Sequence, residues 1–221
     1  MGSLSVITKN DLVEIVKRLY NTIDEKKDYL SKLDTEIGDG DHGFSMFSGF
    51  KSFYEKLGEF SELSIGQLLK KGGFELIKTI GGAAGAVFGT FFTGQASYYE
   101  KNLDGKENLS LEDITNMLNE ALTQIKKRGN ANPGDKTMID ALEPAVNELF
   151  AGIEKNLSLS DAFKNAAEKA EQGAQSTKDM VSKHGRSKNL GERSIGFIDA
   201  GAMSTCIIFR TIADYIEKPG N

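Results

Sequence analysis

Three aspartates, Asp34, Asp39 and Asp41, lie in one short glycine-rich segment of the sequence, LDTEIGDGDHG. Carboxylate oxygens are the ligands that hard cations such as Mg²⁺ and Ca²⁺ prefer. Glycine permits backbone conformations that let neighbouring carboxylates converge on one point. Because clustered negative charges repel one another unless a cation lies between them, this segment predicts a site for a hard divalent cation.

Two other interpretations apply to this segment, an EF-hand and a solvated acidic loop. An EF-hand is excluded, because in a loop starting at Asp39 the required glycine and the final acidic residue fall on Phe44 and Phe50. A solvated acidic loop remains an alternative, since Asp and Gly are also common turn residues. The spacing alone does not decide between a metal site and such a loop.

Helical patterns extend over most of the chain and must position this segment. Thr8 with Asp11 and Ser110 with Asp113 have the spacing of helix capping boxes, and each precedes an amphipathic run. Prolines are few and no apolar–polar alternation typical of strands stands out. The sequence therefore predicts an all-α protein with a single domain over residues 1–221 and eight helices, over residues 8–33, 44–57, 64–80, 83–101, 111–128, 136–152, 160–183 and 201–217.

Composition limits the classes of function. The net charge is −5 and the pI is about 5.2, which disfavours non-specific nucleic-acid binding. No signal peptide is recognised, so we expect a cytoplasmic protein. The 21 uncharged residues 79–99 are long enough to span a bilayer. Their five glycines, with Gly81, Gly85 and Gly89 at four-residue spacing, instead indicate a buried, closely packed helix and no membrane partner.

Glycines concentrate near the ends of the predicted helices. The segments 38–43, 81–89, 129–134 and 185–201 each contain two or more glycines. The N-terminus of a helix offers free N–H groups and a positive dipole end, and glycine lets a phosphate approach the backbone. Several such ends at one rim of a helical bundle would form an anion site facing the acidic segment.

Four motifs, in order and over nearly the whole chain, resemble those of the nucleotide-binding L subunit of dihydroxyacetone kinase. They are D-x4-D-x-D-H-G at residues 34–43, GGAxG at 81–85, GDKTM at 134–138 and GRxxxLGERSIG at 185–196. The resemblance implies an antiparallel eight-helix barrel. It also implies that ADP or ATP and two Mg²⁺ bind at one rim of that barrel.

The resemblance also implies roles for individual residues. Asp34, Asp39 and Asp41 would be the Mg²⁺ ligands and, with Arg186, the catalytic groups. Lys136 is left open between a nucleotide contact and a role in its helix, and His184 matches no motif and is expected in solvent. The implied nucleotide-binding residues are His42, Gly43, Ser45, Ala83, Ala84, Gly129, Met138, Arg186, Asp199 and Gly201.

The chain departs from the family pattern at several positions. Ala84 stands where the family usually has Ser, and Ser45 where Asn is common. Phe197 and Ala200 replace the His and Pro of the family's GHxDPGA segment, although Asp199 is retained. These departures remove polar groups from the implied nucleotide site and put the match to partner and substrate in doubt.

The function that the resemblance implies is phosphoryl transfer to a ketone held on a separate K subunit. We expect the version in which bound ADP is a coenzyme, recharged by a phosphotransferase-system protein from phosphoenolpyruvate. An ATP-consuming kinase for another small ketose is an alternative. So is a non-catalytic partner of a transcription regulator, which Ala84 and Phe197 motivate. A fatty-acid-kinase-type domain fits less well, because the metal loop of that type lacks the Asp-His-Gly ending that this chain has at residues 41–43. Whether the chain forms a homodimer is left open.

Overall fold

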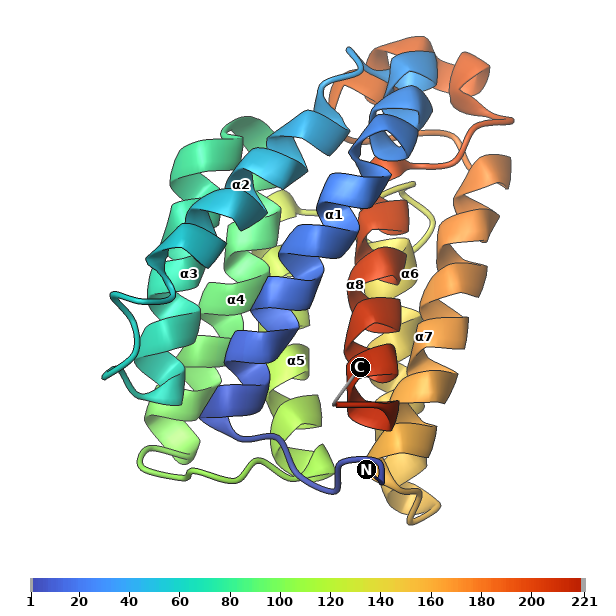
Figure 1. Cartoon of the computed structure of the whole chain (residues 1–221). Coiled ribbons are helices and arrows are strands. Elements are labelled where there is room, and N and C mark those ends of the chain that lie inside the picture. The colour runs from blue at the N-terminus through green and yellow to red at the C-terminus, as the bar shows by residue number, and fades with distance from the viewer. Residues whose placement is uncertain (1, 220–221) are drawn as a thin grey trace.

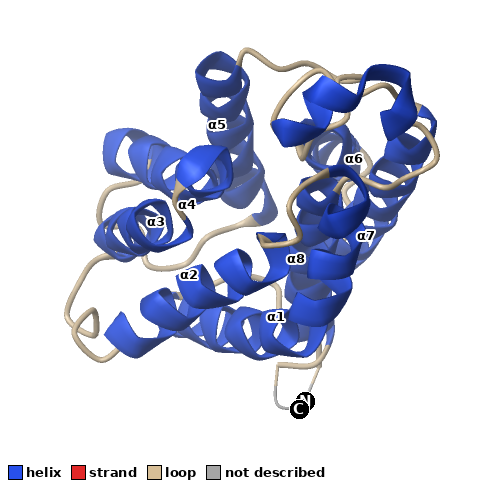
Figure 2. Ribbon diagram, turned by 90° about the horizontal axis from the view of Figure 1, so that it is seen from above, coloured by secondary structure: helices blue, strands red, loops and turns tan. Residues whose placement is uncertain are grey.

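Eight α-helices run alternately in opposite directions and close into a ring (Figure 1). In this computed structural model, which describes residues 2–219, each helix packs against the next and the eighth packs against the first. Figure 2 looks onto one end of the ring. The all-α prediction is confirmed. The helices are α1 (Lys9–Ile37), α2 (His42–Lys56), α3 (Ile65–Ile80), α4 (Gly82–Asn102), α5 (Leu111–Gly129), α6 (Ile139–Glu154), α7 (Leu159–Ser176) and α8 (Ala200–Glu217).

Because the helices alternate in direction, α1, α3, α5 and α7 all begin at one end of the barrel, here called the capped end. Each of these four helices starts after a Ser or Thr whose side-chain oxygen accepts a hydrogen bond from a backbone N–H in the first turn. Such caps satisfy N–H groups that otherwise lack a partner within the helix. The capping residues are Thr8, Ser64, Ser110 and Ser158.

Helices α3 and α4 approach each other through glycines. A Cβ on Gly73 would lie 2.8 Å from the Gly89 carbonyl oxygen, and a Cβ on Gly89 would lie 2.7 Å from the Gly73 oxygen. Any larger residue would push the two backbones apart. Most of the uncharged run 79–99 therefore lies in α4, a closely packed helix of the barrel, and its first two residues end α3. Within the described residues, no helix has the length and apolar character needed to cross a bilayer.

Apolar side chains fill the inside of the ring as one continuous cluster. Aromatic rings of α2 and α4 meet there edge to face, with Phe53 and Phe92 centroids 5.6 Å apart and Phe50 and Phe92 centroids 6.1 Å apart. Aromatic pairs prefer this geometry to face-to-face stacking. The packed interior makes the barrel a rigid frame for the groups at its ends.

The structure shifts three predicted boundaries at the end opposite the capped end, which we call the rim. Helix α1 continues to Ile37, so Asp34 lies in its last turn rather than in a loop. Helix α6 begins at Ile139 because Lys136 adopts a φ of +60°. Helix α7 ends at Ser176, before the residue 183 that its pattern predicted.

Residues 177–199, which connect α7 to α8 across the rim, form a segment we call the strap. It contains the short 3₁₀ helix η1 (Thr177–Asp179) and the 3₁₀ segment η2 (Arg186–Ser194), which a kink at Gly191 divides in two. Figure 1 shows it in orange above the ends of α7 and α8. The sequence pattern predicted neither 3₁₀ helix, since both are short and polar.

Candidate functional site

A cavity of about 430 Å³ opens at the rim, where α2, α4, α6 and α8 begin. The ends of α1, α3 and α5 and the strap complete its wall. Residues far apart in the sequence thus meet around one space. Twelve of the residues singled out from the sequence line it: Asp34, Asp39, Asp41, His42, Ser45, Ala83, Ala84, Gly129, Met138, Arg186, Asp199 and Gly201.

The three aspartates of the acidic segment converge at this cavity. Asp34, Asp39 and Asp41 each present a carboxylate oxygen, and these oxygens lie within 4.8 Å of one another. The Asp34 carboxylate is fixed by the backbone, because it accepts hydrogen bonds from the N–H groups of Gly40 at 2.8 Å and His42 at 3.4 Å. Three hard oxygen donors in this arrangement fit a divalent cation such as Mg²⁺.

Gly43 is the one predicted residue that does not line the cavity. A Cβ at this position would lie 1.8 Å from the Lys27 carbonyl oxygen of α1, and its N–H donates to Ser31 Oγ at 3.1 Å. Its missing side chain lets α2 start directly against α1. Gly43 therefore shapes the turn that carries the aspartates, and it does so from behind the cavity wall.

The helices that begin at the rim differ from those that begin at the capped end. Asp41, Gly81 and Met138, which precede α2, α4 and α6, make no side-chain hydrogen bond to the first turns of their helices. Other side chains bind N–H groups at the starts of α2 and α6, because Asp34 and Ser31 accept from α2 and Thr137 Oγ1 accepts from the Ile139 N–H at 3.2 Å. Gly81 reaches its position with a φ of +69°, which a residue with a side chain adopts only with strain. The start of α4 has no side-chain cap, so its N–H groups and its helix dipole favour an anion such as phosphate in the cavity.

His42 is buried beside the aspartates at the start of α2. Burial lowers the pKa of its imidazole to about 4, although the Asp34 charge and a backbone contact at Ala200 oppose that shift. Its Nε2 lies 2.8 Å from Ser204 Oγ on α8. At neutral pH this ring is uncharged, so it contributes hydrogen bonding and shape rather than positive charge.

Asp199 lies on the cavity wall just before α8 and caps that helix by accepting a hydrogen bond from the Ala202 N–H at 2.7 Å. Burial raises the pKa of its carboxyl to about 6, and the nearby charges of Asp140 and Asp34 raise it further. The Ala202 N–H and Lys136 oppose the shift. Negative charge is therefore already concentrated at the rim beyond the three aspartates of the acidic segment.

Arg186 provides positive charge on the same wall. Its guanidinium on the strap forms an ion pair with Asp39, and its side chain is 67% exposed. This contact links the strap to the acidic segment across the mouth of the cavity. The exposed guanidinium can turn toward an anion in the cavity without losing buried contacts.

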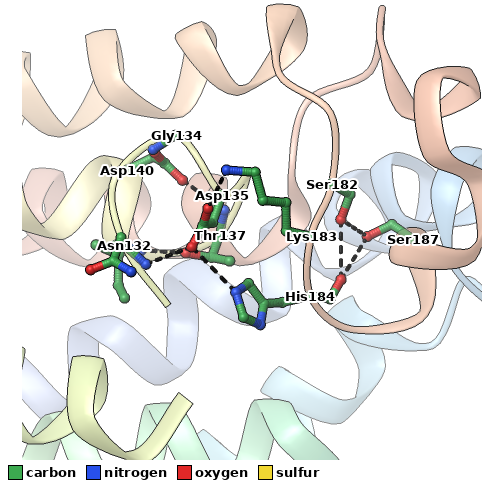
Figure 3. Close-up of polar contacts among 10 residues, drawn as sticks. Asn132, Gly134, Asp135, Thr137, Asp140, Ser182, Lys183, His184 and Ser187 are labelled. Carbon is green, nitrogen blue, oxygen red and sulfur yellow. Dashed lines mark hydrogen bonds and ion pairs between the residues drawn. The ribbon is translucent and has the colours of Figure 1, made fainter. Parts of the chain in front are cut away.

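The sequence did not assign two polar residues of the cavity wall, because it left the role of Lys136 open and predicted His184 to lie in solvent. Lys136 is buried, and its ammonium donates to backbone carbonyls of the strap. His184 is half-buried, and its Nε2 lies 3.3 Å from Asp135 Oδ2, so the expectation of a solvated His184 is wrong (Figure 3). Both residues contact segments more than 40 positions away. A local sequence pattern cannot predict such long-range contacts.

Comparisons with known proteins agree with the geometry. Residues 36–214 match the DAK2 domain family. The chain is 38% identical to the "PEP-dependent dihydroxyacetone kinase, ADP-binding subunit DhaL" of Escherichia coli, a match that covers 94% of this chain and 97% of that protein. It is 31% identical to the "PTS-dependent dihydroxyacetone kinase, ADP-binding subunit DhaL" of Lactococcus lactis, over 96% of this chain and all of that protein. The chain belongs to the DhaL family of dihydroxyacetone kinase subunits.

Solved structures show the same fold. The dihydroxyacetone kinase from C. freundii, in complex with AMP-PNP and Mg²⁺, superposes with a TM-score of 0.73 and 25% sequence identity. The match covers 95% of this chain and 34% of that longer protein. The resemblance of the four motifs to this family is thereby confirmed.

Proposed function

We propose that this chain is the nucleotide-binding, phosphoryl-transfer subunit of a dihydroxyacetone kinase. It binds ADP or ATP with two Mg²⁺ in the rim cavity and passes a phosphoryl group to a ketone held on a separate K subunit. One observation carries this proposal: three carboxylates and the start of α4, which has no side-chain cap, face the same cavity. The names of the relatives and the AMP-PNP and Mg²⁺ of the structural neighbour support it.

The cavity supplies what phosphoryl transfer needs. Bound Mg²⁺ would neutralise phosphate charge, held by the oxygens of Asp34, Asp39 and Asp41. The N–H groups at the start of α4 would orient the phosphates, and Arg186 would add a positive charge at the mouth. Phosphoryl transfer depends on positioning and charge stabilisation more than on a protein nucleophile, and this wall provides both.

We further propose that the nucleotide is ADP kept as a bound coenzyme and recharged by a phosphotransferase-system protein. The relatives that match over nearly their full length carry PEP-dependent or PTS-dependent in their names. By contrast, the chain spans only 32% of the L-erythrulose kinase of Pectobacterium atrosepticum, to which it is 32% identical. ATP consumption for another small ketose is the alternative.

Mass spectrometry of nucleotide released from the purified, denatured protein tests this proposal. We expect about one ADP per chain after gel filtration in Mg²⁺, and loss of that ADP in Asp39→Ala. Asp104→Ala is the matched control, because Asp104 is an exposed carboxylate in the loop after α4, at the capped end. Rapid loss of nucleotide from the unaltered protein on dilution would favour the ATP-consuming version.

Phosphoryl transfer to dihydroxyacetone, measured with a K subunit and a recharging system, tests the catalytic part. We expect product formation that requires Mg²⁺ and is abolished by Asp39→Ala. Retained ADP without any transfer in this assay would instead favour the non-catalytic partner of a transcription regulator. Absence of both nucleotide and transfer would contradict the proposed function altogether.

A further inference from the structure

The buried ammonium of Lys136 joins both ends of the strap. Its Nζ donates to the backbone carbonyl oxygens of Thr177, Met180, Ser194 and Phe197, at 2.5 to 3.3 Å. These acceptors span 21 residues of chain, from Thr177 in η1 to Phe197 after η2. Lysine has three N–H donors, so the carbonyls surround the ammonium and share its protons.

Burying a lysine charge costs free energy unless dipoles or opposite charges replace the lost water. Lys136 is 1% exposed, and it reaches this position with a backbone φ of +60°. Burial lowers its pKa, whereas the charges of Asp199, Asp179 and Asp140 favour the protonated form. A side chain that only filled space here would be apolar, so the carbonyl cage indicates that the charge has a positioning role.

The neighbouring residue strengthens the same connection. The Asp135 carboxylate accepts from Lys183 Nζ at 2.7 Å and lies 3.3 Å from His184 Nε2, as Figure 3 shows. Its backbone carbonyl accepts from the Lys183 N–H at 3.2 Å. The segment before α6 thus holds the strap at its two ends and at its middle.

Arg186 depends on the strap for its position. It begins η2, and its exposed guanidinium reaches Asp39 only because the strap crosses the rim at this height. Asp199 depends on it too, because its backbone N–H donates to Thr177 Oγ1 at 2.9 Å, next to the carbonyl that Lys136 binds. Both residues line the cavity at points that the cage determines.

We propose that Lys136 is a positioning residue for nucleotide binding, acting through the strap on Arg186. This inference rests on the proposed function, since it assigns a role in the same cavity. Removing the ammonium leaves buried carbonyls without a donor, and the strap then moves to regain water. The barrel helices do not use these contacts, so they stay folded.

Titration of Mg–ADP into four variants tests this inference. We expect Lys136→Met to weaken binding by about tenfold or more, the range found when residues that orient ligand-binding groups are removed. Lys136→Met combined with Arg186→Met should bind no more weakly than Arg186→Met alone, because both changes remove one coupled unit. Lys126→Met is the control, since Lys126 pairs with Glu143 and does not line the cavity.

Hydrogen exchange gives a readout independent of nucleotide. In Lys136→Met, amides of residues 178–197 should exchange faster, while those within α1 to α8 keep their protection. Lys136→Gln, which keeps one donor group, serves if Lys136→Met does not fold. Failure of both variants to fold would overturn the inference, because it requires the barrel to survive.

The outcomes separate this inference from the proposed function. If the unaltered protein binds no Mg–ADP, the proposed function fails, whatever the strap does. If the unaltered protein binds but Lys136→Met binds equally well, the positioning role fails and the function stands. Fully additive losses from Lys136→Met and Arg186→Met would also overturn it, since Lys136 would then act independently of Arg186.

Discussion

The two ends of the barrel are built from the same helices but differ in how regularly the helix starts are capped. At the capped end, four helices begin with a Ser or Thr that satisfies a first-turn N–H. At the rim, α4 begins without such a bond, and three carboxylates cluster at the same cavity. The difference teaches that one end is built for stability, whereas the other combines a helix start without a side-chain cap with carboxylates that can hold a ligand.

The pH dependence of stability should come mainly from the rim, and Asp199→Asn tests this with the largest expected effect. The Asp199 carboxyl has a pKa of about 6 in the folded protein and 3.8 as a free side chain. The folded state thus binds a proton more tightly than the unfolded state. The stabilisation from this proton is complete below the unfolded pKa and is lost as pH rises through about 6.

A rise of the Asp199 pKa from 3.8 to about 6 limits this loss of unfolding free energy to about 3 kcal/mol. The actual loss is smaller, because the side chain is partly exposed and solvent screens its charge. Asp199→Asn keeps an acceptor for the Ala202 N–H but cannot ionise. Urea unfolding at pH 5 and pH 8 should therefore show a smaller loss of stability in the variant. If the unfolding free energy changed equally with pH in the unaltered protein and in Asp199→Asn, Asp199 would not be the source of the pH dependence.

Removal of the metal should abolish ligand stabilisation, which is the second largest effect. Mg–ADP at about 100 times its Kd should raise the free energy of unfolding by about 2.7 kcal/mol. EDTA should remove this gain, because three carboxylates then face the phosphates without a cation. Asp34→Asn should lose the gain in Mg²⁺ as well. Thermal unfolding with and without Mg–ADP measures this gain in stability. A gain that persists in EDTA would exclude a role of the metal in nucleotide binding.

Loss of a cap at the other end should cost stability but not binding. Ser110 Oγ accepts from the Asp113 N–H at 3.2 Å and donates to its carboxylate at 2.7 Å. Ser110→Ala should lower the free energy of unfolding by about 1 kcal/mol. Its affinity for Mg–ADP, measured by calorimetry on the folded protein, should stay unchanged. Weaker nucleotide binding in this variant would mean that the two ends are coupled.

The smallest effect is expected for an ion pair on the outer wall. Lys70 Nζ lies 3.0 Å from a Glu100 oxygen, and both side chains are more than a third exposed. Lys70→Met should change the free energy of unfolding by less than about 0.5 kcal/mol, because solvent screens such pairs. Chemical denaturation at low and high salt measures it. A larger loss would show that the wall, and not only its ends, carries electrostatic stability.

The sequence predicted the barrel's helices well because their determinants are local. The capping boxes at Thr8 and Ser110 appear where the sequence placed them. The acidic segment was also recognisable, because its three aspartates lie within eight residues. What the sequence did not predict depends on distant contacts: α7 stops at Ser176 where the strap begins, and nothing local indicates it.

The cavity shows the same division. Motifs near helix ends identified twelve residues of its wall, since each motif precedes or follows a helix boundary. The role of Lys136 stayed open and the contact of His184 was not predicted, because their partners come from segments that only folding brings near. Gly43 was placed on the wall by resemblance, yet its contact with the Lys27 carbonyl puts it behind. Membership of the same motif therefore does not distinguish a residue that shapes the turn, such as Gly43, from one that lines the cavity.

The count of helices has a consequence for how the chain can be extended. Eight alternating helices return the chain to the end at which it started, and the Leu4 N–H bonds the Ile216 carbonyl oxygen at 2.9 Å there. An odd number of alternating helices would instead place the two ends on opposite sides of the barrel. With even parity, a polypeptide joined at either terminus, or a linker joining both in a circular permutant, leaves the mouth of the cavity open to a partner.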